Sequence, residues 1–319
     1  AIASQAGVHI LDRHSDSDHN RTVITFVGPP AAVEEAAFRS IAKAAELINL
    51  DEHTGEHPRI GAADVVPFVP ISGISMAECV AMAQRLGARV GGELGIPVYL
   101  YENAATRPDR VNLEDIRRGQ YELLKKEIGT NLDRKPDFGP SILGTAGATV
   151  IGARPPLIAF NVYLTTDDVS IAKMIAKAVR HSSGGFHFVK ALGMLVDGRA
   201  QVSMNLTNYK KTPVARVVEL IRREAARYGV AIHHSELVGL IPQQALVDAA
   251  QWYLQLDQFE PEQILEQRIT AASHPTAQAK SLGGDFLDAL AAGTATPGGG
   301  SAAAYAGAAG AALGARGAR

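Results

Sequence analysis

The first half of the chain alternates short apolar runs with helical stripes. After Pro29 and Pro30, apolar residues recur at spacings of three and four, which is the period of one face of an α-helix. Ser75 and Glu78 have the spacing of a capping box at the start of a second helix, and Asn112 is placed to cap a third. Short apolar runs between the helices predict strands at residues 8–11, 22–27, 63–71 and 96–101.

The second half has a simpler pattern. A strand predicted at residues 157–164 precedes a helix, and Asp197-Gly198 then separates two further strands, a strong short hairpin signal. A helix that ends at Gly229 and a closing strand at residues 230–240 follow. The resulting order, β-α-β-β-α-β, is the ferredoxin-like split βαβ pattern.

These patterns predict an α+β protein with two related subdomains. The first half reads β-β-α-β before an extra helix and strand, and one strand and one helix ahead of Ala1 would complete the βαββαβ order. We therefore expect two ferredoxin-like subdomains, the first truncated at its N-terminus. Small and polar residues then suggest a linker before an Ala- and Gly-rich helical fragment. The predicted boundaries are residues 1–150, 151–269, 270–284 for the linker and 285–319 for the fragment.

Composition narrows the class of protein. The formal net charge is -2, so no global basic field exists, and this argues against non-specific nucleic-acid binding. No apolar run reaches the length of about 18 residues that a membrane-spanning helix needs. The single cysteine, Cys79, excludes an internal disulfide and a CxxC metal site. Its place on the apolar stripe of a helix predicts a core residue, and a reducing cytoplasm is the expected compartment.

The segment from His53 to Arg59 carries the sharpest candidate chemistry. It matches the H-x-x-E-H pattern of some zinc proteases, which requires both histidines on one helical face. Gly55 weakens a helix there and Pro58 disfavours helical geometry at His57, so we expect a loop without metal. Two interpretations of His57 remain open: a solvated loop histidine, or a histidine that transfers protons near neutral pH.

A second polar segment, residues 14–21, alternates Asp and His as a metal site would. Asp, Ser and Asn are also the residues that a turn between strands uses, and the turn is the favoured interpretation. Asn20 and Arg21 come immediately before the next strand and could face a ligand.

Two further segments combine glycine with aromatic or basic residues. Residues 137–148 carry glycines that allow a ligand close to the backbone, although a plain linker is the alternative. Residues 182–190 either expose backbone amides to a ligand or form a flexible turn, and Lys190 offers positive charge for a carboxylate.

Six separated stretches together resemble the glutamate formiminotransferase family. They read LDRHSDSDHNRTVITFVG, DEHTGEHPRIGAADVVPFVPI, GIPVYLYENAA, DFGPS, SSGGFHFVKALG and ELVGLIPQQAL, in this order. The resemblance covers residues 8–269, and its most diagnostic part is GEHPRIGA, residues 55–62. Residues 286–288 and 293–301 are similar to the opening of a cyclodeaminase domain, which is helical and much longer than the remaining chain.

The resemblance implies an activity. The family transfers the formimino group of N-formimino-L-glutamate to nitrogen 5 of tetrahydrofolate, during histidine degradation, with folate as a substrate in a tunnel between two αβ subdomains. The family's catalytic histidine falls on His57. Its folate-contacting stretches fall on Gly139, Pro140, Ser141, Gly144, Gly147, Gly184, Gly185 and Phe186. We expect no bound metal, no cyclodeaminase activity from this fragment, no nucleic-acid or membrane partner, and a homo-oligomer.

Both substrates carry carboxylates that need cationic partners. Arg21, Arg59 and Lys190 are the candidates by chemistry, since arginine binds a carboxylate through two parallel hydrogen bonds and lysine acts as a point charge. Two alternatives to formimino transfer remain: formyl transfer involving N-formylglutamate or 5-formyltetrahydrofolate, and a non-catalytic folate-binding protein.

Overall fold

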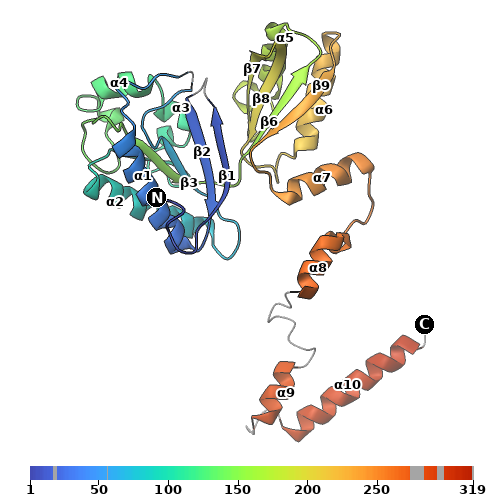
Figure 1. The fold of residues 1–319 in the computed structure, drawn as a ribbon. Helices are drawn as coiled ribbons and strands as arrows, with labels where there is room; N and C mark the ends of the chain where they lie inside the picture. Colours follow the sequence, from blue (N-terminus) through green and yellow to red (C-terminus); the bar gives the residue numbers. More distant parts are fainter. Residues whose placement is uncertain (17–19, 56, 274–283, 293–297, 318–319) are drawn as a thin grey trace. The chain divides into compact units, whose positions relative to one another are not determined.

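The structure is a computed structural model that describes residues 1–16, 20–55, 57–273, 284–292 and 298–317. The chain forms two compact units, Ala1–Leu254 and Gln255–Arg319. The first unit contains two sheet-based subdomains, and the second is helical (Figure 1).

The first subdomain contains two separate sheets. Its N-terminal hairpin, β1 (His9–Asp16) and β2 (Arg21–Val27), forms a two-stranded antiparallel sheet. The other sheet is parallel, in the order β3-β5-β4, with bounds Val65–Phe68, Thr149–Ala153 and Val98–Glu102. Parallel pairing follows because helix α2 (Met76–Glu93) carries the chain back across the sheet between β3 and β4.

Helices cover both faces of the parallel sheet. Val98 and Leu100 of β4 pack in one cluster with buried residues of α1 (Pro30–Leu47) and α2. Tyr99 and Tyr101 point to the other face, where they pack with residues of α3 (Leu113–Ile116) and α4 (Gln120–Glu127). Two 3₁₀ turns flank these helices, η1 (Pro108–Arg110) and η2 (Leu132–Arg134).

The second subdomain has the predicted order of elements. Four strands form an antiparallel sheet in the order β7-β8-β6-β9, with bounds Val189–Val196, Arg199–Leu206, Ile158–Leu164 and Ile232–Val238. Helices α5 (Val169–Val179) and α6 (Val214–Arg227) bury their apolar faces against it. A short turn, η3 (His181–Ser183), and helix α7 (Gln243–Leu254) complete the unit.

The second unit consists of the turn η4 (Pro261–Gln263) and helices α8 (Leu265–Ser273), α9 (Gly284–Ala291) and α10 (Gly299–Gly317). The predicted linker at residues 270–284 therefore begins inside α8. Residues 274–283 of that linker, and residues 293–297 of the cyclodeaminase-like stretch, lie outside the described residues.

The first half has the predicted β-β-α-β order followed by a helix and a strand, but its strands do not pair as in a ferredoxin-like sheet. Its main sheet is parallel, and its central strand, β5, begins directly after the glycine-containing segment of residues 137–148 and was not among the predicted strands. The apolar run of β5 is short and directly follows glycines, so its strand character is hidden in the pattern. His14 and Asp16 also lie in β1 rather than in a turn, because an exposed hairpin accepts polar side chains once its backbone groups are paired.

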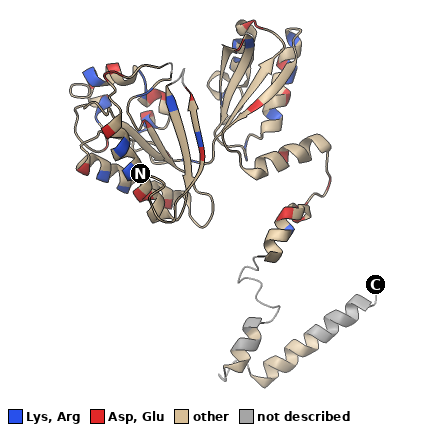
Figure 2. Ribbon diagram, in the orientation of Figure 1, with Lys and Arg blue, Asp and Glu red and all other residues tan. Residues whose placement is uncertain are grey.

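Only residues 154–157 separate β5 from β6. The carboxyl end of the first subdomain's central strand therefore leads directly into the second subdomain (Figure 1). Charges of both signs are interspersed along α1, α2, α4 and α6 rather than gathered by sign (Figure 2). Within the described ranges, no helix is both long and apolar enough to cross a membrane.

Candidate active site

The segment that carries His57 is a loop, as predicted. Residues 53–55 and 57–59 have no helical backbone, and the His57 side chain is partly buried. Glu56, the central residue of the zinc-protease pattern, lies outside the described residues. In the part of the chain that is described, no group of three or more His, Cys, Asp or Glu side chains is placed to hold a metal ion. The expected absence of metal stays a prediction.

The hairpin turn holds one side of this loop. Asn20, in the left-handed region with φ of 47°, donates from Nδ2 to the carbonyl of Thr54 at 2.7 Å. The ring Nε2 of His53 lies 3.1 Å from the carbonyl oxygen of Asn20. The hairpin turn and the His57 loop, more than 30 positions apart in the sequence, are thus joined by two contacts, one from a side chain of each segment to the backbone of the other.

The predicted folate segment holds the other side. The Ala62 amide donates to the carbonyl of Ala146 at 2.9 Å, and the Ala148 amide donates to the carbonyl of Ile60 at 2.8 Å. Gly61 and Gly147 pair in an antiparallel bridge between these bonds. A Cβ on Gly61 would lie 1.8 Å from the carbonyl oxygen of Ala148, so only glycine permits this approach.

Arg59 anchors the loop to α4. Its guanidinium donates to both carboxylate oxygens of Glu122, at 3.0 and 2.7 Å, and to the carbonyl of His53 at 3.0 Å. The hydrogen bonds to Arg59 hold the pKa of the Glu122 carboxyl below its ordinary value. A substrate carboxylate at Arg59 would have to displace Glu122, so the observed contacts point to a role in fixing the loop.

Asp64 connects the loop to the α3–α4 junction. Its carboxylate accepts from the Ile60 amide at 2.8 Å and forms an ion pair with Arg117. Burial raises the pKa of the Asp64 carboxyl, against the opposing effects of Arg117 and of the backbone amides. Burial likewise lowers the pKa of the Arg21 guanidinium, whose charge also interacts with Asp16, Arg117 and Asp64.

Unsatisfied polar atoms gather at this loop. Among the described residues, the buried side-chain nitrogens and oxygens that lack a hydrogen-bond partner in the protein are His53 Nδ1, Arg59 Nε and Arg117 Nε. An unpaired buried donor typically costs about 1–3 kcal/mol, and folded proteins carry few of them. His53 and Arg59 belong to the loop of His57, and Arg117 pairs with Asp64, which binds the Ile60 amide of that loop, so a polar ligand there meets unpaired guanidinium donors and an unpaired imidazole nitrogen.

The remaining predicted residues lie elsewhere. Gly139 packs against Gly91 of α2, with Pro140 and Ser141 following it. Gly185 and Phe186 donate backbone hydrogen bonds to Arg180 and Val179 inside the second subdomain, beside Gly184. The ammonium of Lys190 forms an ion pair with Glu114 of α3, at 2.8 Å, and so links the two subdomains.

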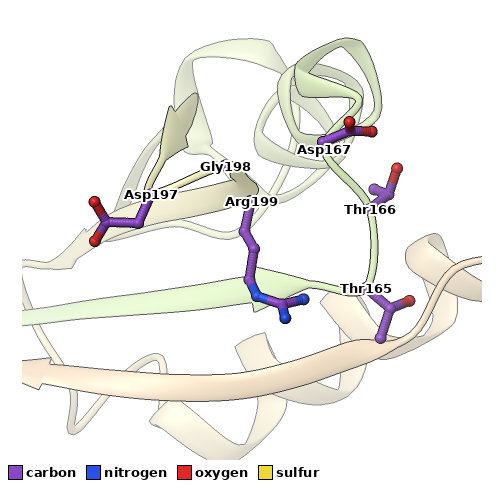
Figure 3. Close-up of a pocket in the computed structure, with 6 residues that line it drawn as sticks. All are labelled: Thr165, Thr166, Asp167, Asp197, Gly198 and Arg199. Carbon is purple, nitrogen blue, oxygen red and sulfur yellow. The ribbon is translucent and has the colours of Figure 1, made fainter.

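A surface hollow of about 440 Å³ lies away from these residues. It sits between the β7–β8 turn and the start of α5, and Figure 3 shows Arg199 extending from β8 while Asp197 points away from the other side chains. None of the predicted site residues line it, and its open polar surface suits water better than a folate ring.

Sequence reasoning missed Asp64, Arg117 and Glu122. A signal existed for Asp64, a lone acid at the start of an apolar strand, because a charge in such a place requires a partner. Arg117 directly follows the short helix α3 and Glu122 lies on α4, where charged residues are common, so pattern alone could not single them out.

Comparison with known proteins identifies the family of this chain. Family models match along the chain: the formiminotransferase domain's N-terminal subdomain at residues 1–154, the formiminotransferase domain at 159–272, and formiminotransferase-cyclodeaminase at 283–319. The chain is 54% identical to a glutamate formimidoyltransferase of Thermoplasma acidophilum, over 86% of this chain and 91% of the relative. It is 48% identical to one of Streptococcus pyogenes serotype M1, over 82% and 89% respectively. A formimidoyltransferase-cyclodeaminase of Gallus gallus is 38% identical, over 98% of this chain and 64% of the relative. The chain belongs to the formiminotransferase family.

Proposed function

We propose that this protein is a glutamate formimidoyltransferase that moves the formimino group of N-formimino-L-glutamate to nitrogen 5 of tetrahydrofolate. The family matches and the names of the relatives support the reaction. The structural observation that carries the proposal is the loop of His57, held by three separate segments, together with buried nitrogens of His53, Arg59 and Arg117 that have no hydrogen-bond partner among the described residues.

His57 is proposed as the general acid and base. Nitrogen 5 attacks the formimino carbon, and a tetrahedral intermediate forms as its N–H proton passes to the imidazole. The bond from carbon to the glutamate nitrogen then breaks, and the imidazolium returns the proton to that nitrogen. Histidine suits both steps because its pKa lies near neutrality. Holding both substrates in the reacting geometry contributes further, up to about 7–11 kcal/mol in favourable cases.

Tetrahydrofolate is proposed to lie between the two subdomains, in a tunnel. Glycine-containing segments on both sides support this placement, Gly144 and Gly147 beside the His57 loop and Gly184 in the second subdomain. Lys190 is close to the first subdomain and remains a candidate for a substrate carboxylate, as does Arg21. Domain boundaries at residues 150, 269 and 284 also stay proposals.

The cytoplasm is the proposed compartment. The single cysteine supports it: Cys79 is buried in the core of the first subdomain, and burial raises the pKa of its thiol. A homo-oligomer stays a prediction.

Purified protein with tetrahydrofolate and either glutamate derivative tests the reaction. With N-formimino-L-glutamate we expect 5-formiminotetrahydrofolate and glutamate in equal amounts. Faster turnover of N-formylglutamate would replace the proposal with formyl transfer. Tetrahydrofolate binding in calorimetry without turnover of either donor would show a non-catalytic binding protein instead.

A further inference from the structure

The α3–α4 junction brings a second arginine to the candidate site. Arg117 directs Nη2 to Asp64, while its Nε is buried without an acceptor among the described residues. Arg21 lies close enough for its charge to interact with both Arg117 and Asp64. Across the described residues, no side-chain hydrogen bond is formed by the Arg21 guanidinium, although Asp16 faces it across the hairpin. The Arg21 guanidinium thus lies within electrostatic range of the Arg117–Asp64 ion pair.

We propose that Arg117 and Arg21 together bind a carboxylate of the glutamate donor, and that Asp64 positions Arg117 for this contact. The inference rests on the proposed function and adds a residue and a ligand group to it. A carboxylate oxygen supplies the acceptor that Arg117 Nε lacks, and its second oxygen reaches Arg21. Charge-assisted bonds of this kind are the strongest that arginine makes.

Location favours the donor over tetrahydrofolate as the source of this carboxylate. Arg21 directly follows Asn20, which binds Thr54 on one side of the His57 loop. Asp64 accepts from the Ile60 amide on the other side. The donor is small, so its carboxylates stay near the formimino carbon. The glutamate of tetrahydrofolate is separated from nitrogen 5 by an aminobenzoyl group, which places it further from the reacting atoms.

Asp64 links the proposed contact between Arg117 and the donor to the backbone of the His57 loop. Its carboxylate holds Arg117 and the backbone of the loop at once, through the ion pair and the Ile60 amide. A donor carboxylate on Arg117 is therefore placed in fixed relation to the residues that follow His57. The arrangement orients the donor as well as binding it.

Steady-state kinetics of Arg117→Lys, with Arg118→Lys as the matched control, test the proposal. Lysine retains the charge opposite Asp64 but loses Nε and the planar fork. We expect the KM of N-formimino-L-glutamate to rise about 10- to 100-fold, with kcat within about threefold and the KM of tetrahydrofolate unchanged. The inhibition constant of glutarate should rise by a similar factor. Arg118 is exposed and pairs with Asp115, so its variant should match the wild type.

An unchanged donor KM, or a rise confined to tetrahydrofolate, would overturn the proposal. If Arg117→Lys lowers the melting temperature by several degrees, Arg21→Lys is the deciding variant. We expect the same rise in the KM of the donor for Arg21→Lys, and an unchanged KM would contradict the proposal. A wild type without formimino transfer would refute the proposed function separately. Glutarate binding by calorimetry would then still test the subsite, because weaker binding to the Arg117→Lys protein requires no turnover.

Discussion

His57 is the residue on which the proposed chemistry depends. If its imidazole moves the proton, His57→Gln should lower kcat by about 10²–10⁴ and leave the tetrahydrofolate Kd within about threefold, because an amide cannot titrate near neutral pH. Single-turnover kinetics and calorimetry measure the two quantities. His233→Gln, an exposed histidine on β9, is the control and should keep full activity. Near-normal kcat in His57→Gln would leave histidine with a binding role alone.

Glu102 is the last residue of β4 and has a φ of 54°. Burial raises the pKa of its carboxyl, and the nearby positive charges of Lys190 and Arg154 oppose this rise. Between the unfolded and the folded pKa of Glu102 the folded protein holds a proton that the unfolded chain releases, so stability decreases as pH rises through this window. Glu102→Gln should stabilise the protein more at pH 7.5 than at pH 4.5. Urea unfolding at both values measures the difference, and an equal gain at the two would contradict this sign.

At the scale of elements, the close backbone contact between the His57 loop and the segment before β5 can be tested by mutation. Gly61→Ala should cost about 2–4 kcal/mol in the free energy of unfolding, because its Cβ would overlap the Ala148 carbonyl. Gly144→Ala is the matched control, since a Cβ there meets nothing within 4 Å, and it should stay within about 0.5 kcal/mol. Equal melting temperatures for the two variants would show that the backbone approach is not required.

Elements with a clear period were predictable, and those defined by their neighbours were not. The capping box of Ser75 and Glu78 and the Asp197-Gly198 turn depend on local residues, and the structure confirms both. β5 is a strand because β3 and β4 pair on either side of it, which no local pattern encodes. The same holds for the candidate site. The loop of His57 could be predicted from Gly55 and Pro58 beside it, whereas the Asp64–Arg117 ion pair forms only when distant elements pack.

At the scale of the whole molecule, the site and the hydrophobic cores lie within residues 1–254. Ending the chain after Ser273 should therefore leave kcat and both KM values within about twofold, and the melting temperature of the first unit within about 2 °C. Kinetics and calorimetry on the full and shortened chains make the comparison. Loss of transfer in the shortened chain would place part of the catalytic machinery in the second unit.

The β1–β2 hairpin is a two-stranded sheet of its own, and its turn holds the loop of His57 through Asn20. Such hairpins are marginally stable in water, so they open locally long before a domain unfolds. When β1 separates from β2, we expect the contacts of Asn20 with Thr54 and His53 to be lost, which removes one of the three supports of the His57 loop. A ligand that binds only the ordered loop must therefore slow this opening by mass action. The rate of amide hydrogen exchange along β2 should therefore report the fraction of protein with ligand bound at the candidate site.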